Sequence, residues 1–279
     1  MKKIKCIILD DEPLAVELLK SYADKQLQTA LQLLETFTPG ADEEIIHQLR
    51  VTLKKIKAVR LFISTLHPAK AKQIRKKVQL IFRAAGSIRE AQLQLQWLKK
   101  KRYLHLIEAA SLAQKITEDE ELFLQQKELF RKLLTSIRED VLKQIHKIKS
   151  SVVTEYAVQL KEELHEQVNH VVKDDWHELR KLSKQLLYAY HWIGEQDKLK
   201  VMTVLSYHTI DQLQEEIGMW HDLVDLQQWL LDEQFFLSKD SSIKLQDNKA
   251  SEQLQKNLLL QEQAVLRQLL VIKKPANQQ

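Results

Sequence analysis

The sequence of 279 residues contains few of the residues that interrupt helices, with only four glycines and four prolines. The residues that dominate instead, Leu, Gln, Lys, Glu and Ala, cost the least free energy in a helix. Hydrophobic residues make up 44% of the chain, which at this length is enough for a buried core. The composition therefore predicts an all-α fold.

Cysteine and long apolar segments are also scarce. Cys6 is the only cysteine, so the chain can form no internal disulfide and no cysteine-based zinc site. No apolar run approaches the roughly 20 residues that a membrane-spanning helix needs. The first residues, MKKIKCIILDDEP, reach acidic positions too early for a signal peptide. We therefore expect a soluble cytoplasmic protein in a reducing compartment, without a membrane partner.

The formal net charge is only +5, but charges of opposite sign are segregated along the chain. From His47 to Arg102 the sequence has 16 Lys or Arg residues and one acid, Glu90, so this window carries +15 and the remainder −10. A surface without a ligand would normally interleave the two signs. Because a segregated positive field attracts polyanions, we interpret the window as a polyanion site. The alternative is an unusually basic surface that binds nothing.

Apolar residues recur with helical spacing over most of the chain. The expected helices cover residues 14–37, 43–66, 69–85, 88–116, 119–149, 151–171, 174–193, 198–216, 219–237 and 250–271. His67-Pro68 marks a short connection between two helices, and Asp174 or Asp175 is suited to cap the helix that follows. Residues 239–250 are expected to form a polar loop.

Two blocks that contain His, Gly and Trp, which are uncommon in this chain, each recur later in the sequence. The distance from the first copy to the second is nearly the same for both blocks. The pattern His-x-x-Arg-x-x-x-Lys at 47–54 returns at 177–184, and a block with Gly and Gln-Trp-Leu at 86–98 returns at 218–230. The repeat predicts a duplicated helical bundle. The predicted organisation is an arm at 1–13, one domain at 14–272 with halves 14–150 and 151–272, and a tail at 273–279. The arm resembles the start of a response-regulator receiver but lacks the further strands of a domain.

Two consecutive helices of the first half are each expected to carry a cationic face beside an apolar one. In the helix 43–66 the apolar stripe comprises Ile46, Leu49, Leu53, Ile56 and Ile63. A neighbouring stripe within about 80° of arc has the spacing i, i+3, i+7 and i+10 and comprises His47, Arg50, Lys54 and Lys57. In the next helix the core positions are Ile74, Val78 and Ile81, and another face carries Lys72, Arg75, Lys76 and Arg83. The two cationic faces can line one groove that suits a linear chain of phosphates.

The blocks IHQLRVTLKKIKAVRLF and WHELRKLSKQLLYAY resemble the two signatures of the conserved histidine α-helical domain, CHAD, and AAGSIREAQLQLQWL resembles its Gly-x-x-Arg helix start. The resemblance covers roughly residues 14–272. It implies two helical bundles related by a pseudo-twofold, a basic central cavity, and binding of inorganic polyphosphate at polyphosphate granules. The implied phosphate-binding residues are His47, Arg50, Lys54, Lys55, Lys57, Arg89, His177, Arg180, Lys181 and Lys184. We expect polyphosphate and its metabolising enzymes as partners, and no catalytic residue, metal or cofactor.

The second half departs from the family pattern. Gln185 and Leu187 stand where the second signature usually continues with basic residues, and His221 stands at the position equivalent to Arg89. Residues 177–233 contain five basic residues and ten acids. We therefore expect the second half to contribute less to the attraction of a polyanion than the first half does.

Two other functions fit parts of the sequence. A nucleic-acid-binding or scaffold protein would also present cations, but readers of single strands add aromatic platforms, and the 47–57 stripe contains none. An HD-type metal phosphohydrolase would use His221-Asp222, with His177 and Asp225, as metal ligands. The internal repeat favours a simpler interpretation of His221-Asp222, as a helix-start residue and its cap.

Overall fold

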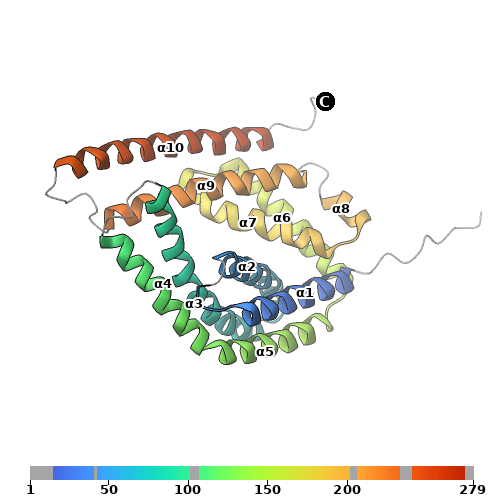
Figure 1. Cartoon of the computed structure of the whole chain (residues 1–279). Coiled ribbons are helices and arrows are strands. Elements are labelled where there is room, and N and C mark those ends of the chain that lie inside the picture. The colour runs from blue at the N-terminus through green and yellow to red at the C-terminus, as the bar shows by residue number, and fades with distance from the viewer. Residues whose placement is uncertain (1–14, 41–42, 101–106, 202–205, 233–240, 274–279) are drawn as a thin grey trace, which may run out of the picture. The chain divides into compact units, whose positions relative to one another are not determined.

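The computed structural model describes residues 15–40, 43–100, 107–201, 206–232 and 241–273. Every regular element in these ranges is helical, which confirms the predicted all-α fold (Figure 1). The α-helices are α1 (Ala15–Thr36), α2 (Glu43–Leu66), α3 (Pro68–Lys100), α4 (Ile107–Gln125), α5 (Lys127–Ile145), α6 (Ser150–His170), α7 (Trp176–Ala189), α8 (Glu195–Val201), α9 (Tyr207–Asp232) and α10 (Ser241–Lys273). Two short 3-10 turns, η1 (Lys173–Asp175) and η2 (Tyr190–Trp192), flank α7.

The chain divides into two compact units, and α6 begins in the first and continues into the second. The first unit runs to Tyr156 and includes His191–Asp197; in it α2 packs against α1, α3 and α5, and α4 packs along α3. The second unit comprises Ala157–Tyr190 and the chain from Lys198, and in it α9 packs against both α7 and α10. The predicted arm at 1–13 lies outside the described residues, as does the predicted tail at 273–279 except for Lys273, which ends α10.

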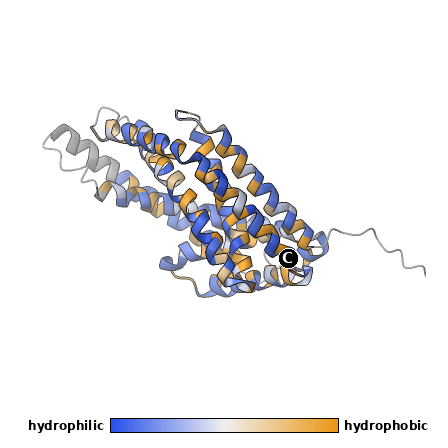
Figure 2. Cartoon of the chain, turned by 90° about the horizontal axis from the view of Figure 1, so that it is seen from below, coloured by the Kyte–Doolittle hydropathy of each residue, from blue (hydrophilic) through white to orange (hydrophobic). Residues whose placement is uncertain are grey.

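The buried residues follow the apolar stripes that helical periodicity predicts. All five residues of the α2 stripe are at most 2% exposed, and the three core positions of α3 are at most 6% exposed. Figure 2 shows hydrophobic and hydrophilic residues alternating along the helices that it colours by hydropathy. None of the described helices is long and apolar enough to cross a membrane.

Several predicted helix boundaries are wrong, although most helices are correct. The predicted breaks before residues 88 and 219 do not exist, because Gly86 and Gly218 lie inside the continuous helices α3 and α9. The predicted break near residue 117 is displaced, since α4 continues to Gln125. The described part of the expected loop 239–250 is instead helical, as α10 begins at Ser241.

The local sequence signals predict the start of α3 correctly but not the capping of α7. Pro68 occupies the first position of α3, where its missing N–H costs no hydrogen bond, so the predicted short connection at His67 is confirmed. Asp175 precedes α7 but makes no side-chain capping bond, contrary to the prediction. Instead of a capping bond, the 3-10 turn η1 leads directly into α7. Lys173, the first residue of η1, follows Val172, whose backbone is extended.

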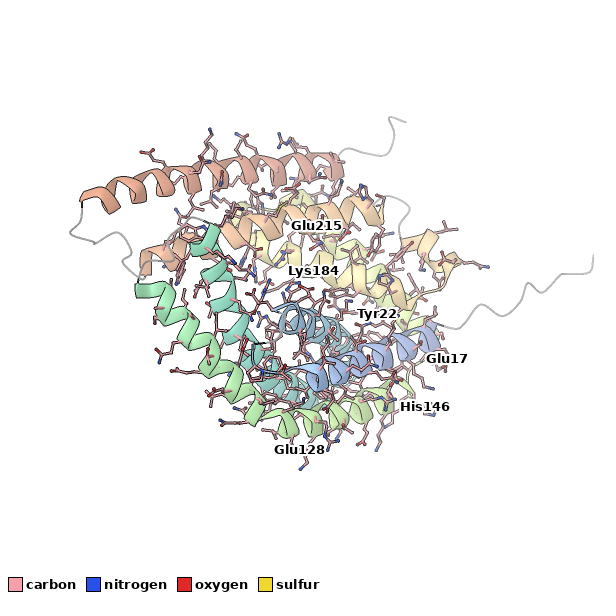
Figure 3. The ribbon with its side chains drawn as sticks, in the orientation of Figure 1. Glu17, Tyr22, Glu128, His146, Lys184 and Glu215 are labelled. Atoms are coloured by element: carbon pink, nitrogen blue, oxygen red, sulfur yellow. The ribbon has the colours of Figure 1, made fainter. Side chains whose placement is uncertain are left out.

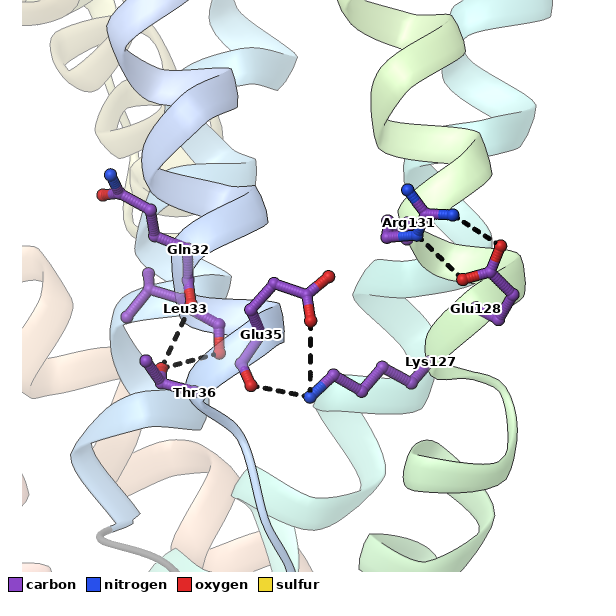
Figure 4. A network of polar contacts seen from close by, with 7 residues as sticks. All are labelled: Gln32, Leu33, Glu35, Thr36, Lys127, Glu128 and Arg131. Carbon is purple, nitrogen blue, oxygen red and sulfur yellow. Dashed lines mark hydrogen bonds and ion pairs between the residues drawn. The ribbon is translucent and has the colours of Figure 1, made fainter.

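Polar contacts join α1 to α5 on the surface of the first unit (Figure 4). Lys127 Nζ donates a hydrogen bond of 2.6 Å to the backbone oxygen of Glu35 and lies 3.7 Å from its carboxylate. Arg138 Nε donates to Asp24 at 2.5 Å. Because exposed pairs of this kind contribute little, the buried apolar faces account for most of the stability of the unit.

Neighbouring residues of α3 provide a test of this assignment of the core. Ile81 is fully buried, whereas Leu80 is 55% exposed. We expect Ile81→Ala to lower the free energy of unfolding by about 2–5 kcal/mol, because it removes buried methyl groups and leaves a cavity. Leu80→Ala, the matched control, should change it by less than about 0.5 kcal/mol. Urea titration followed by circular dichroism measures both, and equal losses would contradict the core assignment.

Candidate polyanion-binding surface

The predicted stripe on α2 lies next to α3 and is partly covered. His47, Arg50 and Lys54 are half-buried, whereas Lys57 is exposed. Burial and then the positive charge of Arg89 lower the pKa of His47, with smaller contributions of the same sign from Lys54 and Arg50. The first stripe is therefore a cluster of nearby cations around a histidine that tends to stay neutral.

The predicted face on α3 is the most accessible part of the surface. Its four members, which we call the α3 cationic face, are all exposed: Lys72, Arg75, Lys76 and Arg83. Among the described residues none of the four forms an ion pair with a carboxylate. By contrast, the neighbouring Lys77 contacts Asp140 and Ser136, each at 2.7 Å. Lys77, whose charge is neutralised by Asp140, is therefore not part of the α3 cationic face.

Arg50 is held between α2 and α3. Its Nη1 donates a hydrogen bond of 3.1 Å to the backbone oxygen of Phe82, and its guanidinium carbon lies 4.3 Å from the centroid of the Phe82 ring. Burial lowers the pKa of Arg50, and the nearby Glu90 opposes that shift. Glu90 is the only acid in the basic window.

The remaining predicted residues of the first unit are less available. Arg89 is half-buried and lies 3.8 Å from the carboxylate of Glu43, which also accepts a hydrogen bond from Gln96. Lys55 is half-buried on α2. The carboxylates at the start of α2 therefore reduce the positive potential at this end of the stripe.

The repeat of the first stripe lies on α7 and comprises His177, Arg180 and Lys184, with Lys181 beside them. Arg180 donates from Nε to the backbone oxygen of Gln214 on α9, at 3.3 Å. Lys181 is exposed and pairs with Glu178 at 2.6 Å, while Lys184 is half-buried. Figure 3 shows Lys184 on α7. The pairing of Lys181 agrees with the weaker positive character of the second half of the sequence.

In the second unit, His177 and His221 stand at the positions equivalent to His47 and Arg89 of the first unit. The rings of His177 and His221 lie with centroids 4.6 Å apart, and His221 Nδ1 lies 2.9 Å from a carboxylate oxygen of Asp225. Burial, followed by the charges of Lys181 and His221, lowers the pKa of His177. The second unit thus has a histidine where the first unit has the permanent cation Arg89.

The structure alters the interpretation of His221-Asp222. The pair lies inside α9, which begins at Tyr207, so the prediction of a helix-start residue and its cap is wrong. His221 contacts Asp225 one turn later rather than Asp222. Within the described part of the chain, no three His, Cys, Asp or Glu side chains are grouped so that they could hold a metal ion.

One candidate residue was missed from the sequence. Arg60 is half-buried on α2, and burial and the charge of nearby Arg75 lower its pKa. It lies three residues after Lys57, but the spacing of the first stripe continues to Leu61, so helical periodicity does not identify Arg60 as a member. Its proximity to Arg75 places cations of α2 and α3 together at the end of the helix pair that Pro68 joins.

These features define an all-α protein in which four exposed cations gather on α3 beside the partly buried cations of α2. The sequence model of the CHAD domain matches residues 21–231, and the chain belongs to the CHAD domain family. The crystal structure of the CHAD domain from the plant Ricinus communis is similar, with a TM-score of 0.68 and 17% sequence identity over 98% of each chain. No curated protein matches the sequence. The resemblance in the histidine-containing blocks is thereby confirmed at the level of family and fold.

The lowered pKa of His177 predicts a pH dependence of stability. An unfolded histidine titrates near pH 6.5, so the unfolded chain takes up this proton more readily than the folded chain does. Stability should therefore fall as the pH drops through about 6.5 and below. We expect His177→Gln to make the decrease in Tm between about pH 7.5 and pH 5.5 smaller. His47→Gln should act in the same direction.

Thermal unfolding at several pH values measures this effect. His146, which is exposed at the C-terminal end of α5 (Figure 3), provides a control substitution, His146→Gln. A pH profile of His177→Gln that is parallel to that of the wild type would contradict the prediction.

Proposed function

We propose that this protein binds inorganic polyphosphate and does not act on it as an enzyme. The observation that carries the proposal is the α3 cationic face, four exposed cations that no described carboxylate neutralises. The CHAD family, to which the chain belongs, is associated with polyphosphate binding. We further propose a location at polyphosphate granules, with polyphosphate-metabolising enzymes as partners.

The chemistry of the α3 cationic face suits a chain of phosphates. Arginine binds phosphate through a planar fork of donors, and lysine acts as a compact point charge. Lys72 and Arg83 are eleven residues apart, which corresponds to about 16 Å along a helix. Several phosphates of one chain can therefore contact the face at once, and each added contact becomes effectively intramolecular.

The arrangement of aromatic side chains favours phosphate over nucleic acid. Bases of a single strand bind by stacking on accessible aromatic rings. The α3 cationic face itself contains no aromatic residue, and the ring of Phe82, on the same helix, is covered by the guanidinium of Arg50. A ligand made only of phosphates needs no such platform. We extend the binding surface from α3 to Lys54, Lys55 and Lys57 of α2.

Charge reversals on the α3 cationic face test this proposal. Lys76→Glu combined with Arg83→Glu removes two attractions and adds two repulsions, and should weaken polyphosphate binding roughly 100-fold at low salt. The affinity of the wild type should fall steeply as salt rises, because bound phosphates release their counterions. Fluorescence titration with labelled long-chain polyphosphate measures the affinities, and circular dichroism checks the folding of each variant.

Two further double variants are matched to this one in charge. Lys99→Glu with Lys100→Glu changes exposed residues at the end of α3, outside the cationic face, and should cost much less affinity. Lys181→Glu with Lys184→Glu tests the second unit, whose sequence is net acidic, and should also cost less. Equal losses in all three variants would show that the total charge, and not the α3 cationic face, determines binding.

A further inference from the structure

We propose that Arg50 and Arg180 are helix clamps that position the cations of the binding surface and are not themselves phosphate ligands. Arg50 clamps α2 against α3 in the first unit, and Arg180 clamps α7 against α9 in the second. The positioning role rests on the proposed function, whereas the clamp itself can be tested without any ligand.

The two arginines make equivalent contacts at equivalent places in the repeat. Arg50 donates to the backbone oxygen of Phe82, and Arg180, its counterpart in the second half, donates to that of Gln214. Phe82 and Gln214 are themselves equivalent, because each precedes the glycine of its block by one helical turn. Carbonyl groups inside a helix already accept a bond from the residue four positions later, and their second lone pair remains available. Each arginine uses this lone pair to connect two helices.

Each clamp depends on a glycine one turn after the carbonyl. A Cβ atom on Gly86 would lie 2.6 Å from Nη1 of Arg50. A Cβ atom on Gly218 would lie 2.8, 3.0 and 3.2 Å from Nη2, Nε and Cζ of Arg180. Glycine is unfavourable in the middle of a helix, so its presence at both positions is explained by the space that each guanidinium needs.

The surroundings of Arg50 also fit a structural role better than a ligand role. Its guanidinium is half-buried, has one face over the Phe82 ring and lies near Glu90. A phosphate would have to compete with that carboxylate and ring, whereas the exposed α3 cationic face offers no such competition. Arg50 thus sets the spacing between α2 and α3, on which the cations that contact the ligand depend.

A double-mutant cycle on thermal stability tests the clamp. Gly86→Ala should lower the Tm by roughly 5 °C in the wild type, because the new methyl group displaces the guanidinium from its contacts. In the Arg50→Ala background the same substitution should raise the Tm by about 3 °C, because only the improved helix propensity remains. The cycle of Arg180→Ala with Gly218→Ala repeats the test in the second unit, should Arg50→Ala not fold.

Arg83→Ala is the matched control, since it removes an exposed cation of α3 that makes no contact with the Gly86 position. Its effect should add to that of Gly86→Ala, as expected for independent sites. If Gly86→Ala and Gly218→Ala shift the Tm equally with and without their arginines, the clamp is refuted.

A salt titration of polyphosphate binding tests the positioning role. The slope of log affinity against log salt reports how many phosphates the protein neutralises. Lys76→Ala should reduce this slope, whereas Arg50→Ala should lower the affinity and leave the slope unchanged. Gly86→Ala, which removes no charge, should also weaken binding.

The outcomes separate the two proposals. A reduced slope in Arg50→Ala, matching that of Lys76→Ala, would identify Arg50 as a phosphate ligand and refute the positioning role. If the wild type does not bind polyphosphate at all, the proposed function fails and the positioning role fails with it. The stability cycles then still decide whether the arginines are clamps.

Discussion

The close approach of two pairs of helices is the constraint on which the candidate site depends. α2 lies near enough to α3 for the guanidinium of Arg50 to reach the backbone oxygen of Phe82, and α7 and α9 are related in the same way through Arg180. The two guanidinium groups occupy the space that a Cβ atom at Gly86 or Gly218 would need. Apolar burial drives these helices together, and the arginine contacts specify how closely they pack.

This arrangement divides the basic residues into two groups with different roles. Half-buried cations such as Arg50 and Arg89 already have partners within the fold, and their charges are partly compensated by Glu90 and Glu43. The exposed residues of the α3 cationic face have no such compensation among the described residues. Like charges along one helix repel each other, so this face is unfavourable for the free protein and becomes favourable when a polyanion is bound.

The two units use the same framework with different electrostatics. In the first, His47 lies near the permanent cation Arg89; in the second, the ring of His177 lies against the ring of His221. The second unit also pairs Lys181 with a glutamate. The helix contacts are therefore more similar between the two copies of the sequence repeat than the charges are. This is what we would expect if the contacts serve the fold and the charges serve the ligand.

Sequence reasoning was most reliable where the signal is local. The apolar stripes of α2 and α3 are buried as predicted, because a period of about 3.6 residues directly determines which face can be buried. The breaks assigned at Gly86 and Gly218 are wrong, because the reason for each glycine is a contact with an arginine on another helix, far away in the sequence. Tertiary contacts of this kind, like the proximity of Arg60 to Arg75, leave no periodic signal in a single sequence.

The most direct test of the central claim is a competition experiment on the wild-type protein. Labelled long-chain polyphosphate is bound first and is then displaced by single-stranded RNA of matched total charge or by unlabelled polyphosphate. Because the α3 cationic face offers no aromatic platform, we expect unlabelled polyphosphate to displace the label at a much lower concentration than RNA does. Displacement by RNA at an equal or lower concentration would contradict polyphosphate recognition and would identify the surface as a nucleic-acid-binding one.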